Sequence, residues 1–121
     1  IGHDDTEFDV RYIVNKIVNL RIFSDGDNNF HISALESGSE ILVVSQFTLY
    51  AATRKGRRPS FAQAAVPEQA EIIFDRVVEE FANSGLKVAS GNFREYMEVS
   101  LVNDGPVTFW LDSVDRMLPR D

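Results

Sequence analysis

The spacing of apolar and polar residues predicts two amphipathic helices in this chain of 121 residues. The first runs from about residue 7 to residue 20, and Thr6 and Asp9 resemble a capping box at its start. The second begins near Pro67, whose missing N–H costs nothing in a first helical turn, and Gly85 suits its C-terminal cap. The apolar stripes, expected to pack in the core, are Val10, Ile13, Val14, Ile17 and Leu20, and then Ala70, Ile73, Phe74, Val77, Val78 and Phe81.

Short apolar or alternating runs predict strands around these helices. The run at residues 41–44, bounded by polar residues, is typical of a strand buried on both faces. Hairpin-like strand pairs between two main helices favour one α+β domain over residues 1–121, rather than a doubly wound sheet. The other strand candidates are residues 21–23, 30–33, 86–88, 97–102 and 107–111, and the polar tail after residue 112 is expected to end the fold.

Two turns between these strands carry polar residues. The aspartate-rich turn at residues 24–29 invites a calcium-loop reading, but no Glu closes it at EF-hand spacing, so a hairpin turn is favoured. The turn Asn103-Asp104-Gly105-Pro106 joins two predicted strands and contains a Gly–Pro peptide, in which the cis form is accessible. It is interpreted either as a simple hairpin turn or as a loop that presents main-chain carbonyls. Residues 36–40 are expected to form a loop around Gly38.

Charge and composition narrow the classes of function. The net charge is −7, which argues against nucleic-acid binding through the bulk surface. Four of the 12 basic residues nevertheless fall together, which indicates a local anion contact or a solvated, flexible loop: Arg54, Lys55, Arg57 and Arg58. No cysteine is present, so disulfides, thiolate metal sites and cysteine nucleophiles are excluded. No apolar run reaches membrane-spanning length, and we expect an intracellular, cytoplasmic protein without a membrane partner.

The chain contains few of the side chains that conventional acid–base or nucleophilic catalysis requires. Ser45 and Thr48 are candidate hydroxyls, but the only histidines are His3, near the start, and His31, in a predicted strand. A serine hydrolase therefore requires His31 to reach Ser45. A zinc site has too few ligands, and neither glycine-rich phosphate motif occurs. The groups that remain as candidates for binding a substrate are main-chain groups and the polar residues at the end of the strand at residues 41–44.

At this point two motifs together resemble the D-aminoacyl-tRNA deacylase family. They are SQFTL at residues 45–49, continuing to TRKGRRPSF, and SLVNDGPVT at residues 100–108. The helix leading to NLRIF at residues 19–23, and LKV at residues 86–88 followed by Gly91 and Phe93, match as well. The resemblance covers essentially the whole chain.

The resemblance implies a homodimeric α+β fold with a sheet curled towards a barrel, and hydrolysis of the ester that joins a D-amino acid, or glycine, to tRNA. A cis Gly–Pro turn from one subunit would exclude L side chains from its partner's pocket, and the ribose 2′-hydroxyl of tRNA would help to activate water. No cofactor or metal is implied. The implied sites are catalytic (Ser45, Gln46, Phe47, Thr48, Gly105 and Pro106, with Thr48 in a positioning role), substrate-binding (Leu49, Met97, Asn103 and Thr108) and RNA-binding (Arg54, Lys55, Arg57 and Arg58).

The chain departs from the family pattern at its start. Family members begin with strands that precede the residue matching Ile1, and some of their residues brace the Gly–Pro turn. We therefore expect an N-terminal portion to be missing, which would leave an open sheet edge. This departure and the basic loop keep an alternative open, in which the chain is a catalytically inactive nucleic-acid-binding module on the same fold.

Overall fold

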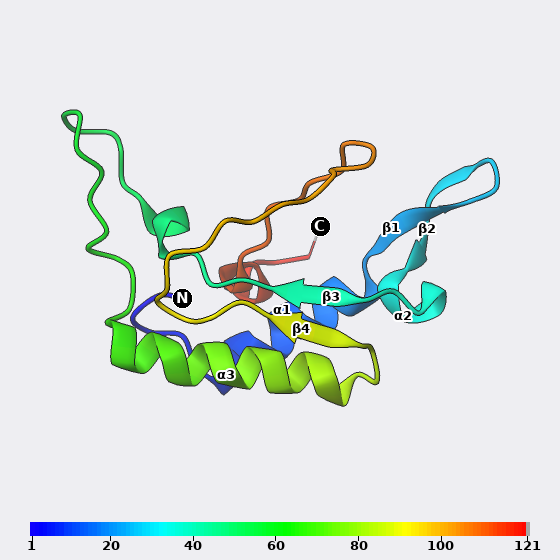
Figure 1. The fold of residues 1–121 in the computed structure, drawn as a ribbon, viewed down its shortest axis with the longest axis horizontal. Helices are drawn as coiled ribbons and strands as arrows, with labels where there is room; N and C mark the ends of the chain where they lie inside the picture. The colour runs from blue at the N-terminus through cyan, green and yellow to red at the C-terminus, as the bar shows by residue number, and fades with distance from the viewer. Residues whose placement is uncertain (121) are drawn as a thin grey trace.

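Two long helices lie against each other along one side of the molecule: α1 (Glu7–Asn19) and α3 (Pro67–Asn83) (Figure 1). They belong to a computed structural model that describes residues 1–120. Both helices fall where the sequence predicts them. No helix of these 120 residues combines the length and apolarity that a membrane crossing requires.

The residues predicted to begin and end the helices do so in the structure. The Asp9 carboxylate accepts a 2.8 Å hydrogen bond from the Thr6 backbone N–H, which satisfies a donor that the first turn of α1 leaves unpaired. Pro67 lies in the first turn of α3. Gly85 follows the end of α3 with φ +87°, and its N–H donates to the Ala82 carbonyl at 3.1 Å.

The core lies between the two helices and one small sheet. Its buried members are Val10, Val14 and Val18 of α1 and Phe81 of α3. Partly buried apolar side chains complete it: Ile17, Ile41, Val43, Ile73, Val77, Leu86 and Val88. The predicted stripes therefore reach the core, although Val18 was not among the predicted residues.

The strands form two separate pairs, and neither sheet is closed. β1 (Arg21–Asp25) and β2 (Asn28–Ser33) make an antiparallel hairpin, as the aspartate-rich turn predicts. β3 (Ile41–Val43) and β4 (Val88–Ser90) pair in parallel. The α+β class is confirmed, with one antiparallel and one parallel pair.

Two local predictions are wrong, and the tail contains a short helix that the sequence did not predict. β3 is not buried on both faces, because Leu42 is 60% exposed and only one face meets the helices. The short helix α2 (Ala34–Ser37) extends into the segment at residues 36–40 that was expected to be a loop, because Ser33 and Glu36 bond each other's backbone N–H in a capping box. The polar tail contains the 3₁₀ helix η2 (Ser113–Met117), whose first turn is capped by the Asp112 carboxylate.

The predicted strands at residues 97–102 and 107–111 are absent. They are instead the two arms of a long loop that folds back on itself and ends at the Asn103–Pro106 turn (Figure 1). Alternating apolar residues form a strand only where a neighbouring strand supplies a hydrogen-bonding edge. Within residues 1–120 the only strand ladders are β1–β2 and β3–β4, so these arms have no such edge.

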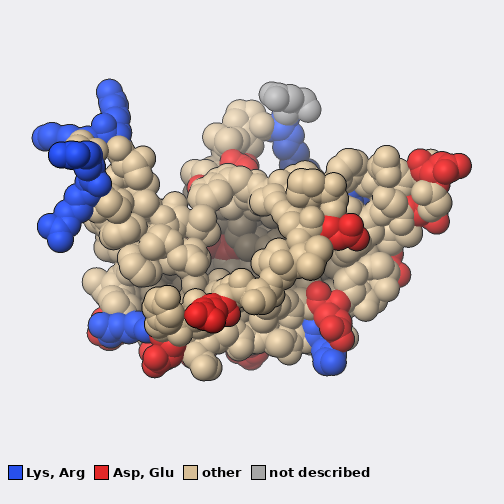
Figure 2. All heavy atoms as spheres, turned by 45° about the horizontal axis from the view of Figure 1, so that its top comes forward, with Lys and Arg blue, Asp and Glu red and all other residues tan. Residues whose placement is uncertain are grey.

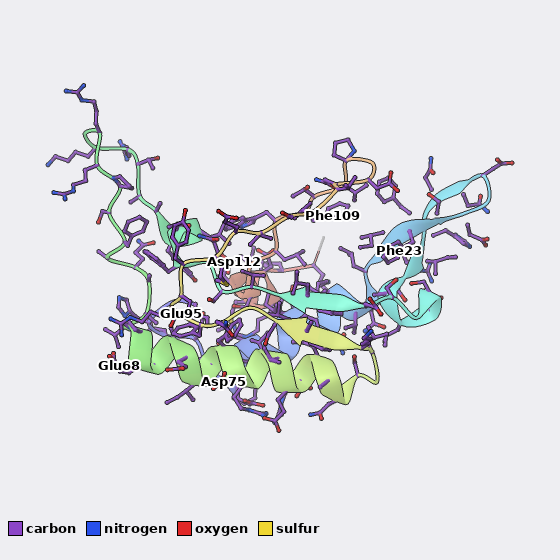
Figure 3. All side chains as sticks on the ribbon, in the orientation of Figure 1. Phe23, Glu68, Asp75, Glu95, Phe109 and Asp112 are labelled. Carbon is purple, nitrogen blue, oxygen red and sulfur yellow. The ribbon has the colours of Figure 1, made fainter. Side chains whose placement is uncertain are left out.

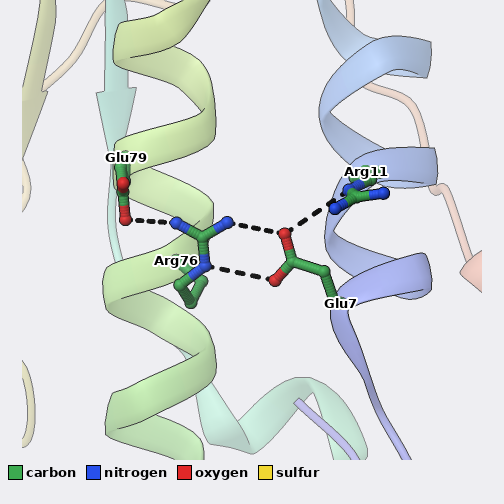
Figure 4. A network of polar contacts seen from close by, with 4 residues as sticks. All are labelled: Glu7, Arg11, Arg76 and Glu79. Atoms are coloured by element: carbon green, nitrogen blue, oxygen red, sulfur yellow. Dashed lines mark hydrogen bonds and ion pairs between the residues drawn. The ribbon is translucent and has the colours of Figure 1, made fainter.

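An ion network ties α1 to α3 (Figure 4). Arg76 of α3 donates from Nε and Nη2 to the two carboxylate oxygens of Glu7, at 3.1 and 2.6 Å. Arg76 also pairs with Glu79, and Arg11 approaches Glu7 at 3.5 Å. These contacts hold the pKa of Glu7 below its usual range, with the Arg76 hydrogen bond as the largest cause.

Candidate active site

The first motif lies directly after β3, in the 3₁₀ helix η1 (Phe47–Tyr50) rather than in a continued strand. The tight turn brings the Gln46 amide within hydrogen-bond reach of the Thr48 hydroxyl. Ser45 is half-buried, whereas the side chains from Gln46 to Leu49 are exposed. The motif therefore presents its polar groups on a surface-facing turn.

Phe47 is held by an aromatic contact with the far side of the basic loop. Its ring meets that of Phe61 edge to face, with centroids 4.9 Å apart. The contact joins the first motif to the segment that follows the basic loop.

The second motif is a self-bracing turn at the end of two arms. The side-chain oxygen of Asn103 accepts a hydrogen bond from the Val107 N–H at 3.0 Å. The side-chain amide of Asn103 donates a hydrogen bond to the Thr108 hydroxyl at 3.0 Å. Gly105 has φ +144°, and the Gly105–Pro106 peptide is cis, as the resemblance implies. Asn103 and Thr108, predicted to contact substrate, here hold the turn in shape.

A hollow of about 770 Å³ brings the two motifs together. Gln46 and Leu49 of the first motif and Val107 of the second line it, and it opens on the face shown in Figure 2. Of the predicted site residues, only Gln46 and Leu49 are in its wall. The Gly105–Pro106 turn stands away from it on exposed arms, and Met97 instead packs against Gly91.

The wall of the hollow also contains residues that the sequence pattern did not single out for a site. Its apolar part includes Ile13 of α1 and Trp110 of the arm, and its polar part includes Tyr50, Asp9 and Asp112. Tyr50 directly follows the first motif, and Trp110 is the single tryptophan of the chain. Both positions could therefore have been recognised in the sequence as candidate site residues. The aspartates had none, because only the fold brings residues 9 and 112 to one wall.

Burial, hydrogen bonds and neighbouring charges shift the pKa values of two of these polar groups. Burial raises the pKa of Tyr50, and the nearby carboxylates of Asp5, Asp112 and Asp9 raise it further. Burial also acts to raise the pKa of Asp9. Hydrogen bonds from Thr6 and Ser113 and the Arg116 cation outweigh that effect, so the pKa of Asp9 lies below its usual range.

The basic residues at positions 54–58 stand at one end of the molecule. Figure 2 shows a cluster of blue side chains on a projecting loop at the upper left, while other blue side chains are scattered among the acidic ones. The loop is closed at its base by a two-way backbone pair between Ala52 and Ser60, at 2.8 and 3.0 Å. All four cations, Arg54, Lys55, Arg57 and Arg58, are exposed.

The serine-hydrolase alternative lacks its geometry. His31 lies on β2, in the hairpin that projects from the body (Figure 1). Ser45 follows β3 near the hollow, and the hydrogen bonds within residues 1–120 include none between the two side chains. We therefore set this alternative aside.

A family model described as D-Tyr-tRNA(Tyr) deacylase matches residues 1–112, a range that contains both motifs and most of the wall of the hollow between them. Deacylases of this kind are hydrolases that act on ester bonds. The chain belongs to the D-Tyr-tRNA(Tyr) deacylase family.

Individual relatives agree with this placement. A D-aminoacyl-tRNA deacylase of Halothermothrix orenii is 58% identical over 113 residues, covering 93% of this chain and 76% of the relative. One of Dehalococcoides mccartyi strain 195 is 48% identical over 120 residues, covering 99% of this chain and 78% of the relative. The solved structure of a protein named c-Myc DNA Unwinding Element Binding Protein matches with a TM-score of 0.80 and 38% identity, over 88% of this chain and 73% of that one.

Proposed function

We propose that this chain hydrolyses the ester bond of D-aminoacyl-tRNA, releasing the free D-amino acid and the tRNA, and that it acts likewise on mischarged glycyl-tRNA. The observation that supports this most is the shared hollow, which joins the two motifs of the deacylase family in one wall. Curated relatives of the family, one of them 58% identical to this chain, carry the name of this activity.

The first motif would hold the aminoacyl end of the substrate. The turn of η1 exposes the Phe47 and Thr48 main chain beside Gln46, so backbone groups can orient the ester carbonyl and the amino group. The Gln46–Thr48 hydrogen bond would fix these side chains in advance. Thr48 positions the substrate rather than attacking it.

Water activation is assigned to the substrate itself. Among the described residues, those in the wall of the hollow include neither histidine nor cysteine, and its titratable groups are Tyr50 and aspartates. A 2′-hydroxyl on the terminal ribose of tRNA, next to the ester, would take the proton-transfer role.

Rejection of L-aminoacyl-tRNA is assigned to the Gly105–Pro106 turn of a second copy of the chain. In one chain this turn is exposed, lies at the tip of two unpaired arms and contributes nothing to the wall of its own hollow. Inserted into a partner's hollow, its rigid carbonyls would leave no space for an L side chain. The active form is therefore proposed to be a homodimer, in the cytoplasm where aminoacyl-tRNA is used.

The exposed cations of the loop at residues 54–58 would contact tRNA phosphates near the acceptor end. Arginine binds phosphate oxygens through charge-assisted hydrogen bonds that position a nucleic acid without reading its sequence. Projection of the loop from an acidic body supports a localised contact of this kind (Figure 2).

The test is a paired deacylation assay with D-Tyr-tRNA and L-Tyr-tRNA at equal concentration. We expect the D-ester to be lost far faster than in buffer alone, and the L-ester to be lost at the buffer rate. Glycyl-tRNA is measured in parallel. Equal loss of the two tyrosyl esters, or no loss above buffer, would contradict the proposal.

A second candidate function is nucleic-acid binding without catalysis. The 38% identical solved structure belongs to a protein named for binding a DNA element, and the exposed basic loop offers a phosphate contact. With this function the chain would bind nucleic acid in a salt-sensitive way and show no turnover in the assay above.

A further inference from the structure

The C-terminal helix η2 lies beyond the residues that the family model matches. The match ends at residue 112, whereas η2 begins at Ser113. The segment nevertheless returns to the body and packs against α1 (Figure 1). Its contacts therefore lie outside the residues that the family model covers, although the Dehalococcoides mccartyi relative is similar over 120 residues.

One ion pair fixes η2 to the start of α1. Arg116 Nη1 lies 2.9 Å from Asp9 Oδ1 and also donates to the Ser113 carbonyl at 3.2 Å. The Arg116 side chain is 28% exposed and that of Asp9 is 11% exposed, so water screens the pair only in part. The other Asp9 oxygen accepts from Thr6, which couples the contact to the helix cap.

The same segment is the root of the arm that carries the Gly105–Pro106 turn. Residues 107–111 have no strand ladder to hold them, so the position of the turn depends on where its arms are anchored. The upstream arm is held at its base by the Gly91 N–H, which donates to the Val43 carbonyl at 2.9 Å. The downstream arm continues through Asp112 directly into η2 (Figure 3).

A weaker contact along the downstream arm supports it nearer the tip. Phe109 meets Phe30 of the β1–β2 hairpin edge to face, with ring centroids 6.2 Å apart. The two residues are more than half exposed, so this contact alone is a soft support. The ion pair at the root is the firmer of the two.

We infer that Arg116, through its contact with Asp9, is a positioning residue that fixes the downstream arm and hence the Gly105–Pro106 turn. This inference rests on the proposed function for its effect on selectivity. Arg116 itself touches no substrate. Its removal loosens the root of the arm, which the Ser113 hydrogen bond to Asp9 still holds in part, so the turn excludes L side chains less strictly.

Trp110 provides a readout that does not depend on activity. It is the single tryptophan of the chain and lies on the arm between the turn and η2. We expect Arg116→Ala to lower the steady-state fluorescence anisotropy of Trp110, and Arg116→Lys, which keeps the cation, to restore most of it. Arg120→Ala is the matched control, because it removes an exposed arginine from the same tail and should leave the anisotropy unchanged.

The activity readout is the ratio of kcat/KM for D-Tyr-tRNA to that for L-Tyr-tRNA. We expect Arg116→Ala to lower this ratio between about tenfold and a hundredfold, mainly by raising L-Tyr-tRNA hydrolysis, because a misplacement of about 1 Å has effects of that size. Thermal unfolding of each variant confirms that it is folded; if Arg116→Ala is not, Arg116→Gln replaces it.

The outcomes separate the two proposals. Unchanged Trp110 anisotropy in folded Arg116→Ala overturns the anchoring role, and lower anisotropy with unchanged selectivity overturns the positioning of the turn. Absence of any D-over-L preference in the wild type instead contradicts the proposed function, while the anisotropy still decides whether Arg116 anchors the arm.

Discussion

At the scale of single residues, the turn between the arms shows how one side chain can replace a strand ladder. Asn103 bonds both the backbone of Val107 and the hydroxyl of Thr108, so three residues brace a turn that has no neighbouring strand. The sequence predicted the turn from its residue types. It could not show that Asn103 and Thr108 bond each other, because that depends on the path of the chain between them.

Gly105 of this turn tolerates substitution poorly. Its φ of +144° disfavours L residues, and an added Cβ would come within 2.7 Å of Val107 Cγ2 and 2.8 Å of the Val107 nitrogen. Replacement by alanine costs of order 1–3 kcal/mol in backbone strain. That cost can be relieved by a shift of the turn.

We therefore expect Gly105→Ala to raise L-Tyr-tRNA hydrolysis while retaining part of the D-Tyr-tRNA activity, measured as kcat/KM for each ester. Gly26→Ala is the matched control, because Gly26 also has a positive φ, of +56°, in an exposed turn but has no atom within 4 Å of the added Cβ. Selectivity that is equal in the two variants would argue against a chirality role for Gly105.

At the scale of elements, the helices formed as predicted and the strands only in part. Cap residues and apolar spacing act within a few residues of each other, so α1 and α3 were predictable from sequence alone. The helix α2 was also signalled, by Ser33 and Glu36, but that capping box was not recognised. Residues 97–102 and 107–111 alternate like strands, but they need a partner edge that residues 1–120 do not supply.

The Glu7–Arg76 pair that joins the two helices predicts a pH dependence of stability. The pKa of Glu7 is lowered in the folded state, so its contribution is present above the unfolded pKa, about 4.3, and is lost as the pH falls through the lower folded value. We expect Glu7→Gln to lower the thermal unfolding midpoint at pH 7, and the gap from the wild type to shrink at pH 3.

Glu71→Gln serves as the control for this prediction, since Glu71 is an exposed glutamate of α3 outside the network. Its unfolding midpoint should follow that of the wild type at both pH values. A Glu7→Gln gap that is as large at pH 3 as at pH 7 would show that altered packing, rather than the ion pair, causes the effect.

At the scale of the whole molecule, charge is separated between a basic loop and an acidic body. The net charge of −7 repels nucleic acid from most of the surface, while four cations project together at one end (Figure 2). Such a distribution orients a polyanion towards the loop. The sequence showed the cluster, and the structure adds that it projects.

We expect Arg57→Ala/Arg58→Ala to weaken tRNA binding and to reduce the slope of log K against log salt by roughly 1 for each phosphate that is no longer bound. In the deacylation assay the same variant should raise KM with little change in kcat, since the loop lies away from the hollow. Lys16→Ala/Lys87→Ala removes two cations outside the loop and is the charge-matched control. Equal salt slopes in the two double variants would contradict binding of tRNA by the loop.

The two helices, the hairpin turn, the basic cluster and the two motifs follow from the amino-acid sequence, because each depends on residues close together in the chain. The folded structure is needed to show that Gln46, Leu49 and Val107 share one hollow, and that Asp9 meets Arg116. Those contacts join residues far apart in the chain. They follow from the packing of α1 against α3 and from the course of unpaired arms, which no local pattern of apolar and polar residues specifies.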